Sequence, residues 1–342
     1  MPIVSNFSHC GNHRSSLLCC VNLMTNPDTI LSVAALAKRF AGGNGIHDVS
    51  FSVPKGSVTG FIGANGAGKS TTLRCIVGVM RPDAGEIRLF DEPWSKSARA
   101  RIGFLPEERG LFGHERAREA IAFHGALKGM PRRDALAAAD HLLQRAGLSG
   151  RESDRIGSLS KGNAQRVQVL CALVHRPGLL LLDEPLSGLD PTAQADMLSL
   201  LAEFRAEGGA ILFSTHSMAA AEGFCDRIVM LADGRTVFEG SLAEASKAAA
   251  RGVIVITTSD GAGLRAAVSA VGGQVRPLPA VVGDVPRWRV LVPPHIGDEA
   301  LARALANRGV AIEAIQADKA DLETAFWNLA TPATRKVKRE VA

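Results

Sequence analysis

The sequence predicts an α/β fold followed by a small α+β module. A glycine-rich loop at residues 63–70 separates the apolar run from Ser57 to Ile62 from a segment with helical character. Two further runs, Leu179–Leu182 and Ala210–Phe213, are continuously apolar, which is typical of parallel strands covered on both faces. Beyond residue 252 the pattern predicts the order β-α-β-β-α-β, the split βαβ arrangement of ferredoxin-like modules.

The glycine-rich loop reads G-A-N-G-A-G-K-S and matches the phosphate-binding pattern G-x-x-x-x-G-K-[ST]. Its glycines let backbone N–H groups turn toward a polyphosphate, Lys69 can reach the β and γ phosphates, and the Ser70 hydroxyl suits a magnesium ion. A helix expected over 72–80 would point its N-terminus at the phosphates. The loop therefore predicts binding of ATP or GTP. The expected nucleotide contacts are Gly63, Asn65, Gly66, Gly68, Lys69, Ser70 and Thr71.

Composition narrows the class of protein. The 342 residues are 46% hydrophobic and 21% charged, which is ordinary for a packed chain, and the formal net charge of +5 comes from Lys and Arg scattered among acids. We interpret most of that charge as solvated surface and expect no nucleic-acid partner. No run approaches the ~20 apolar residues of a membrane-spanning helix, so a membrane role would need another chain. Cys75, Cys171 and Cys225 lie in apolar segments and indicate reduced core thiols in a cytosolic protein.

The two ends of the chain carry little periodicity. Residues 1–28 are expected to be a disordered extension, with an upstream start codon and Met24 as the working start as one explanation. A metal site is conceivable there, but the spacing of His9, Cys10, His13, Cys19 and Cys20 matches no standard zinc pattern, and a signal peptide is weakly supported. The basic tail at 331–342, with Arg335–Arg339, could contact anionic lipid or only aid solubility.

Between these ends we expect two domains, at 29–245 and 252–330. The first begins with antiparallel strands at 30–36 and 49–53 and contains an Ala-rich helical insertion between residues 111 and 157. A helix over 242–250 leads to the second. Its expected strands are 253–257, 274–277, 288–292 and 310–316, and its expected helices are 263–271, 298–307 and a closing helix at 322–329.

Two carboxylates follow the apolar strand that ends at Leu182. At the carboxyl end of a parallel strand beside the phosphate-binding loop, Asp183 would hold magnesium through water and Glu184 could polarise an attacking water. An Asp-Glu pair after a strand is often structural. The presence of Lys69 upstream favours the catalytic interpretation.

The segment Leu159-Ser160-Lys161-Gly162-Asn163 then identifies a family. Together with the loop and Asp183-Glu184 it resembles ABC transporter ATP-binding proteins, whose signature motif is usually LSGGQ, and the resemblance covers roughly Ile30 to Ser241. It implies that Ser160 and Gly162 contact the γ phosphate of ATP held by the opposite subunit of a head-to-tail dimer. The SKGN form resembles a subgroup of bacterial exporter ATPases with an extra C-terminal domain.

The same resemblance assigns three further residues. Phe40 matches the aromatic residue that stacks on adenine, in a chain that contains no Tyr. Asp190 closes Ser187-Gly-Leu-Asp190, which matches the D-loop that links the two sites of the dimer. His216 follows the 210–213 strand and matches the switch histidine that contacts the γ phosphate.

One position departs from the family in a way that bears on mechanism. Where the family usually has the Q-loop glutamine, the sequence reads Leu105-Pro106-Glu107-Glu108. Glu107 adds negative charge beside the phosphates and cannot donate a hydrogen bond when ionised. We expect Glu107 to be a magnesium ligand; the alternative is that it ties its loop to the helical insertion, by pairing with Arg109 or Arg116.

The resemblance implies an ATP- and Mg²⁺-dependent hydrolase that supplies energy to a separate membrane permease. We expect a homodimer on the cytoplasmic face of the membrane and an export direction. The alternative is a soluble ABC ATPase acting on ribosomes or nucleic acid. A cassette that binds ATP without hydrolysing it is disfavoured by Lys69, Asp183, Glu184 and His216. The C-terminal module could be a regulator, a small-ligand sensor or extra dimer surface.

Overall fold

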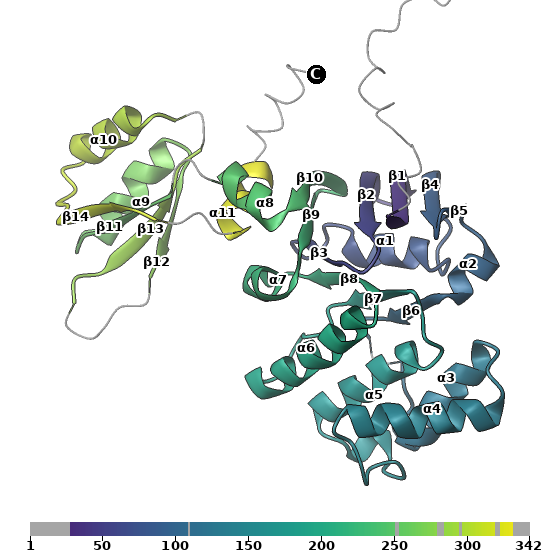
Figure 1. Cartoon of the computed structure of the whole chain (residues 1–342). Helices are drawn as coiled ribbons and strands as arrows, with labels where there is room; N and C mark the ends of the chain where they lie inside the picture. Colours follow the sequence, from purple (N-terminus) through teal and green to yellow (C-terminus); the bar gives the residue numbers. More distant parts are fainter. Residues whose placement is uncertain are drawn as a thin grey trace, which may run out of the picture.

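The computed structural model describes residues 28–108, 110–249, 253–278, 284–293, 296–318 and 322–330. The expectations for residues 1–27 and for the basic tail lie outside these ranges, as does Arg109. Within them the chain forms one large sheet with helices on both sides and a second, smaller sheet with its own helices (Figure 1).

The large sheet has ten strands in the order β5-β4-β1-β2-β10-β9-β3-β8-β7-β6. Its parallel part contains β9, β3, β8, β7 and β6, and the remaining strands pair antiparallel apart from a single parallel pair of residues between β10 and β2. The bounds are β1 Thr29–Arg39, β2 Gly45–Pro54, β3 Val58–Gly63, β4 Ala84–Leu89, β5 Glu92–Pro93, β6 Ile102–Leu105, β7 Leu179–Asp183, β8 Ala210–Thr215, β9 Arg227–Ala232 and β10 Arg235–Ser241.

The central strands are apolar because helices or strands cover both of their faces. Every residue of β3, β7 and β8 is buried, and alternate side chains enter two hydrophobic clusters, one on each side of the sheet. The predicted parallel core and antiparallel β subdomain are therefore confirmed. β9 and β10, which complete the sheet between β3 and β2, were not predicted from the sequence.

The helical insertion contains α3 (Ala117–Leu127) and α4 (Arg132–Arg145), and α5 (Lys161–Leu173) follows it. Ala139 and Leu143 of α4 are buried, as the three-and-four spacing predicts. The other helices of this part are α1 (Lys69–Ile76), α2 (Lys96–Ala100), α6 (Pro191–Ala206), α7 (Met218–Phe224) and α8 (Leu242–Ala249).

The predicted helix over 72–80 is displaced in the structure. α1 begins at Lys69, directly after the loop, and ends at Ile76. Gly78 has φ +70°, a left-handed conformation that suits glycine and stops the helix, although Val79 and Met80 continue the apolar pattern.

The smaller sheet has the order β12-β13-β11-β14, all neighbours antiparallel. With α9 and α10 it gives the predicted ferredoxin-like β-α-β-β-α-β order, and its apolar cluster includes Ile256, Leu264 and Leu301. Its elements are β11 Val253–Thr257, α9 Gly261–Ala270, β12 Gln274–Pro277, β13 Arg287–Leu291, α10 Asp298–Asn307 and β14 Ala314–Ala317.

The closing helix, α11 (Leu322–Ala330), packs on the large sheet's side of the molecule (Figure 1). Leu322 and Ala325 are fully buried in the same cluster as α3 and α5, and the backbone N–H of Leu322 donates to the Glu222 carboxylate of α7 at 2.6 Å. The sequence assigned this helix to the 252–330 domain. Its apolar face instead covers α7 and α8, because the small sheet's own cluster is already closed by α9 and α10.

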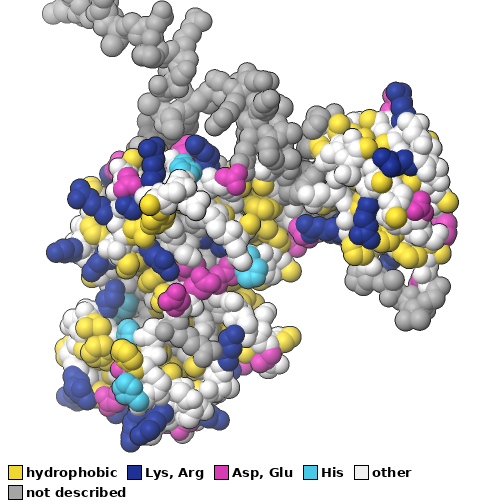
Figure 2. Space-filling view, turned by 180° about the vertical axis from the view of Figure 1, so that it is seen from behind, with side chains coloured by type: hydrophobic (Ala, Val, Ile, Leu, Met, Phe, Trp, Pro, Cys, Tyr) yellow, Lys and Arg dark blue, Asp and Glu magenta, His cyan; other side chains and the backbone are white. Residues whose placement is uncertain are grey.

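No helix within the described ranges is long and apolar enough to cross a membrane. On the face shown in Figure 2, Lys and Arg side chains are interspersed with Asp and Glu over most of the surface.

Candidate functional site

The phosphate-binding loop connects β3 to α1 and depends on its glycines. Gly66 and Gly68 have φ +81° and +104°, a region that other residues rarely adopt. A Cβ on Gly68 would lie 2.4 Å from the Ile46 side chain, and a Cβ on Gly63 would lie 2.8 Å from the Leu231 carbonyl oxygen. Gly66 faces open space instead. The loop is therefore packed against β2 and β9 on one side and open on the other.

Lys69 is the first residue of α1 and is buried, with 6% of its side chain exposed. Its Nζ donates to the Gly63 carbonyl oxygen at 2.7 Å and lies 3.4 Å from Glu184 Oε1. The ammonium group thus lies inside the loop. It is opposed by one buried carboxylate, and it can exchange its carbonyl partner for a phosphate oxygen.

Glu184 joins Lys69 to His216. Its Oε2 lies 2.9 Å from His216 Nδ1, while its Oε1 is buried and has no hydrogen-bond partner among the described residues. The imidazole, by contrast, is 56% exposed. Oε1 faces the Lys69 ammonium at 3.4 Å, which balances its charge and leaves it able to accept a hydrogen bond from a ligand or water.

Ser214 organises the two carboxylates and was not singled out from the sequence. Its hydroxyl donates to Asp183 Oδ1 at 2.7 Å and accepts the backbone N–H of Glu184 at 2.9 Å. This second bond holds Glu184 in a left-handed conformation, with φ +51°, which costs about 1–3 kcal/mol for a non-glycine residue. Ser214 lies in β8 next to Thr215 and two residues before His216, and nothing in that sequence indicates its contacts with the neighbouring strand.

These residues meet because their strands are neighbours. β3 ends at the loop, β8 lies beside it and leads to His216, and β7 lies beside β8 and ends at Asp183. The donors suit Mg²⁺, which binds through one or two carboxylates together with substrate phosphates, and Ser70 lies partly exposed at the start of α1. No group of three or more His, Cys, Asp or Glu in the described part could hold a metal by itself.

Glu107 follows β6, and its exposed side chain lines a cavity of about 430 Å³. Glu184 lines the same cavity, so the structure brings the unusual carboxylate close to the candidate site. No ion pair between Glu107 and Arg116 occurs among the described residues. The remaining lining residues are Glu108, Lys161, Gln165 and Ser187. Lys161 and Glu107, two departures from the family pattern, therefore share one space.

Ser160 and Asp190 have local roles as helix caps. The Ser160 hydroxyl accepts the N–H of Asn163 at the start of α5, and Asp190 Oδ1 accepts the N–H of Ala193 at the start of α6. A Cβ on Gly162 would lie 2.8 Å from that of Ala193, so Gly162 lets α5 and α6 approach closely. None of the three contacts Lys69 or Glu184 through a hydrogen bond or ion pair in the described part of the chain.

Phe40 lies in the turn between β1 and β2 and is 41% exposed. The turn leads to Ile46, which packs on Gly68 of the phosphate-binding loop. Asn65 is exposed on the loop and Thr71 is half-buried in the first turn of α1. These three residues make no side-chain hydrogen bond to the carboxylates within the described ranges.

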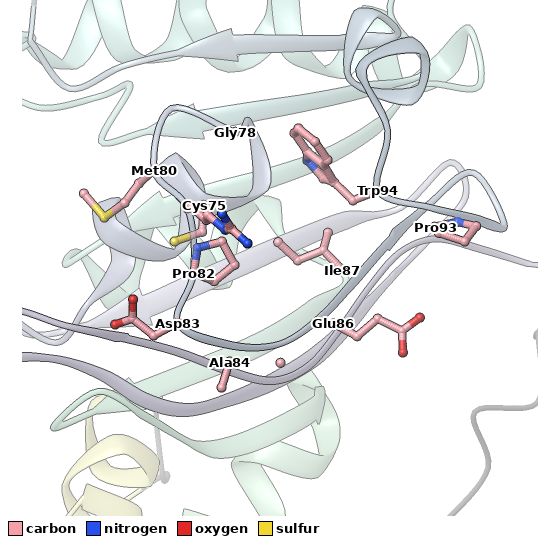
Figure 3. Close-up of a pocket in the computed structure, with 12 residues that line it drawn as sticks. Cys75, Gly78, Met80, Pro82, Asp83, Ala84, Glu86, Ile87, Pro93 and Trp94 are labelled. Carbon is pink, nitrogen blue, oxygen red and sulfur yellow. The ribbon is translucent and has the colours of Figure 1, made fainter.

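A separate cavity of about 600 Å³ lies at the other end of α1, beside β4 and β5 (Figure 3). It is lined by Cys75, Met80, Ile87 and Trp94, among others. Burial raises the pKa of Cys75 to about 11, so the thiol stays protonated at neutral pH. Because Lys69 and Cys75 occupy opposite ends of α1, this cavity is not part of the phosphate-binding site.

Comparison with known proteins decides the family. The family model described as ABC transporter matches residues 46–187, which include the loop, Ser160 and both carboxylates. An uncharacterized ABC transporter ATP-binding protein, YhaQ of Bacillus subtilis (strain 168), is 33% identical over 231 residues, 68% of this chain and 78% of that protein. The chain belongs to the ABC transporter ATP-binding protein family. It is therefore an ATP-binding subunit that hydrolyses ATP, of the kind that works with membrane permeases.

Other ABC transporter proteins are similar over a somewhat smaller share of the chain. A Nod factor export ATP-binding protein I of Burkholderia lata is 39% identical over 207 residues, covering 60% of this chain and 68% of that protein. A solved ATP-binding subunit of an ABC transporter superposes with a TM-score of 0.59 at 33% identity, covering 64% of this chain and 92% of the other. Another, cbiO1 of Clostridium perfringens, gives a TM-score of 0.56 at 28% identity and covers 63% and 89%.

Proposed function

We propose that this ABC ATPase is the energy-supplying subunit of an exporter and works with a separate permease in the membrane. The observation that carries the catalytic part is the buried Glu184 carboxylate, which lies between Lys69 and His216 at the strand end beside the phosphate-binding loop. The export direction is supported by similarity to Nod factor export ATP-binding proteins and by the SKGN signature with a C-terminal module.

In this proposal Lys69 moves from the Gly63 carbonyl to the β and γ phosphates of ATP. Ser70 and Asp183 would hold Mg²⁺, with Glu107 as a further ligand, and the ion would neutralise phosphate charge. Glu184 accepts a proton from the attacking water, while His216 orients that carboxylate and contacts the γ phosphate. Phe40 stacks on adenine. Gly63, Asn65, Gly66, Gly68 and Thr71 surround the phosphates.

The second part of the site comes from another copy of the chain. We propose that Ser160 and Gly162 contact ATP held by the partner subunit in a head-to-tail homodimer, with Asp190 linking the two sites. Support comes from the lack of any hydrogen bond or ion pair between these residues and Lys69 or Glu184 in the described part of one chain. Closure of the dimer on ATP would shift the permease between its two orientations, and hydrolysis would reset it.

The helical insertion offers the surface for the permease. Phe112, Phe123 and Leu127 are 65%, 55% and 67% exposed there, an unusual exposure for large apolar side chains that fits a protein interface. Such docking would place the subunit at the cytoplasmic face of the membrane.

The test is co-purification in mild detergent after affinity capture of the full-length chain, with identification of any integral membrane protein retained. We expect a permease to be retained by the native chain and lost in the double variant Phe123→Ser/Leu127→Ser. The matched control is Val79→Ser, because Val79 is 72% exposed but lies outside the insertion. Retention of ribosomes without a membrane protein would favour the soluble ABC ATPase instead.

A further inference from the structure

A basic cavity lies at the end of the sheet opposite the phosphate-binding loop. It has a volume of about 640 Å³ and is bordered by residues just before β6 and β7 and by the turn between α3 and α4. The phosphate-binding loop and Asp183 are at the other ends of the parallel strands. The cavity is therefore a separate place on the molecule.

The lining of this cavity carries positive charge without a carboxylate. Arg101, Lys128, His175 and Arg176 line it, and its other lining residues are Ala100, Gly129, Met130, Pro131 and Gly178. No ion pair of Arg101, Lys128 or Arg176 occurs in the described part of the chain. Arg176 also borders a neighbouring space that is lined by the carboxylate of Asp134, so it faces a negative charge that Arg101 and Lys128 do not.

Two of these side chains converge on one backbone atom. Lys128 Nζ donates to the Ile102 carbonyl oxygen at 2.9 Å, and His175 Nε2 lies 3.1 Å from the same oxygen. Because a carbonyl oxygen only accepts, Nε2 carries the hydrogen, and Nδ1 is buried without a hydrogen-bond partner among the described residues. Lys128 keeps two further N–H donors that a ligand can use, whereas the neutral His175 ring has no N–H left to donate.

Arg101 is held in place from the other side. Its guanidinium lies over the Phe90 ring, 3.7 Å from the centroid, and its carbonyl oxygen accepts the N–H of Gly178. A Cβ on Gly178 would lie 2.9 Å from the Phe90 ring, so that ring is packed on the backbone. A guanidinium that stacks on a ring loses less conformational freedom than an unstacked one when it binds an oxyanion.

The cluster carries an electrostatic cost in the free chain. Burial and the nearby charge of Arg99 lower the pKa of Lys128. Neighbouring positive charges repel one another, and a ligand with two or more negative charges would remove that repulsion while supplying acceptors for several N–H groups.

We propose that this cavity binds a multivalent phosphate anion through Arg101 and Lys128, beside the neutral ring of His175. Since β6 belongs to the core sheet and Lys128 to the end of α3, the bound anion would link the core to the helical insertion. The shared chemistry is a phosphate group with at least two negative charges, supplied by a free phosphate compound or by a phospholipid headgroup. The second source is relevant because Leu127, next to Lys128, is exposed.

The test uses the full-length Lys69→Ala variant, in which anion binding at the phosphate-binding loop is weakened. Sodium pyrophosphate is titrated without magnesium by calorimetry, and the imidazole NMR signals of His175 report binding at the cavity. We expect saturable binding, a shift of the His175 signals, and a loss of affinity of about tenfold or more in Arg101→Gln and in Lys128→Gln. Arg133→Gln, an exposed arginine of the same insertion, is the matched control.

A parallel arm measures flotation with phosphatidylcholine vesicles, with and without phosphatidic acid. Pyrophosphate binding alone identifies a free phosphate compound, and binding to phosphatidic acid vesicles that is lost in Arg101→Gln identifies a headgroup. The proposal is overturned if neither probe binds, if the His175 signals do not move, or if Arg133→Gln weakens binding as much as the cavity variants. Arg101→Gln keeps the test decisive should Lys128→Gln fail to fold.

Discussion

The imidazole of His216 is hydrogen-bonded to the carboxylate of Glu184, with 2.9 Å between Nδ1 and Oε2. The His216 side chain is 56% exposed and the Glu184 side chain 9% exposed, so the hydrogen bond joins an exposed ring to a buried base. The contact joins the segment after β8 to the end of β7 and orients the carboxylate beside Lys69.

Glu184→Gln should leave ATP binding intact and slow hydrolysis by roughly 10²–10⁴-fold, the usual contribution of a positioned general base. The amide keeps the shape and can still bond to His216. Steady-state phosphate release measures the hydrolysis rate, and ATP titration measures binding. An ATP-stabilised dimer of the variant should appear by size exclusion. Hydrolysis at the native rate would remove Glu184 from the mechanism.

Lys69→Ala should act at the earlier step of nucleotide binding. The substitution removes the buried charge closest to the loop's own carbonyls and leaves Glu184 without its cation. We expect a fall in ATP affinity by calorimetry, while Lys96→Ala, an exposed lysine of α2, should have no effect. Equal affinity of native chain and variant would contradict the assigned use of the loop.

Ser160→Arg should abolish turnover with ATP binding to the monomer largely unchanged, because Ser160 serves the site of the other subunit. The variant also loses the cap of α5, at a cost of about 1 kcal/mol in unfolding free energy. Ser160→Ala loses the same cap without the bulk, and Ser158→Arg adds the same bulk to an exposed residue nearby. Normal hydrolysis by Ser160→Arg at all protein concentrations would exclude a shared site.

Glu107→Gln should shift the dependence of hydrolysis on magnesium concentration, with ATP bound as well or better. The change removes one negative charge from the cavity that Glu107 shares with Glu184. Glu108→Gln is the matched control in the same cavity. Superimposable magnesium curves for native chain and Glu107→Gln would defeat the role as a metal ligand, and a loss confined to permease-stimulated turnover would favour the link to the helical insertion.

Lowering the pH should destabilise the fold through His175. Burial, helped by the charge of Lys128, lowers the pKa of His175 from 6.5 to about 4. Above about pH 6.5, His175 is neutral in both the folded and the unfolded chain, and its contribution to the free energy of unfolding is fully present. As the pH falls from 6.5 toward 4, His175 binds a proton in the unfolded chain but not in the folded chain, so the free energy of unfolding decreases.

The loss is at most about 3 kcal/mol and smaller in practice, because the ring is only partly buried. Denaturant unfolding of the native chain and of His175→Asn at several pH values separates the contribution of His175 from that of the carboxylates. Parallel stability curves for the two proteins between pH 7 and 4.5 would contradict the assignment.

Local motifs predicted the site better than they predicted the packing. Lys69, Asp183 and Glu184 lie at or beyond the ends of strands whose apolar character is unambiguous. Their proximity could therefore be inferred from the amino-acid sequence. Ser214 could not be found this way, because its role depends on two atoms of the neighbouring strand. The end of α1 was misplaced because apolar residues continue beyond Gly78, whose backbone conformation alone stops the helix.

Packing between segments far apart in the chain was the hardest feature to predict from the sequence. β14 begins at Ala314 rather than Val310, because Val310 is buried in the small sheet's cluster without pairing in a strand. The apolar stripe of α11 is equally compatible with either core. Only the position of Glu222 on α7, which accepts the first N–H of α11, and the buried contacts of Leu322 and Ala325 show where that helix packs.

The packing of α11 determines how the module with the small sheet is attached to the ATPase. The chain leaves the ATPase through α8 and returns to it through α11, and these two helices pack on each other. The ferredoxin-like module is thus an insertion held at both ends, rather than a tail. Cutting the chain after residue 249 would strip a helix from the ATPase core and bare the surface that Leu322 and Ala325 now cover, whereas excising only the segment between α8 and α11 would leave that core closed.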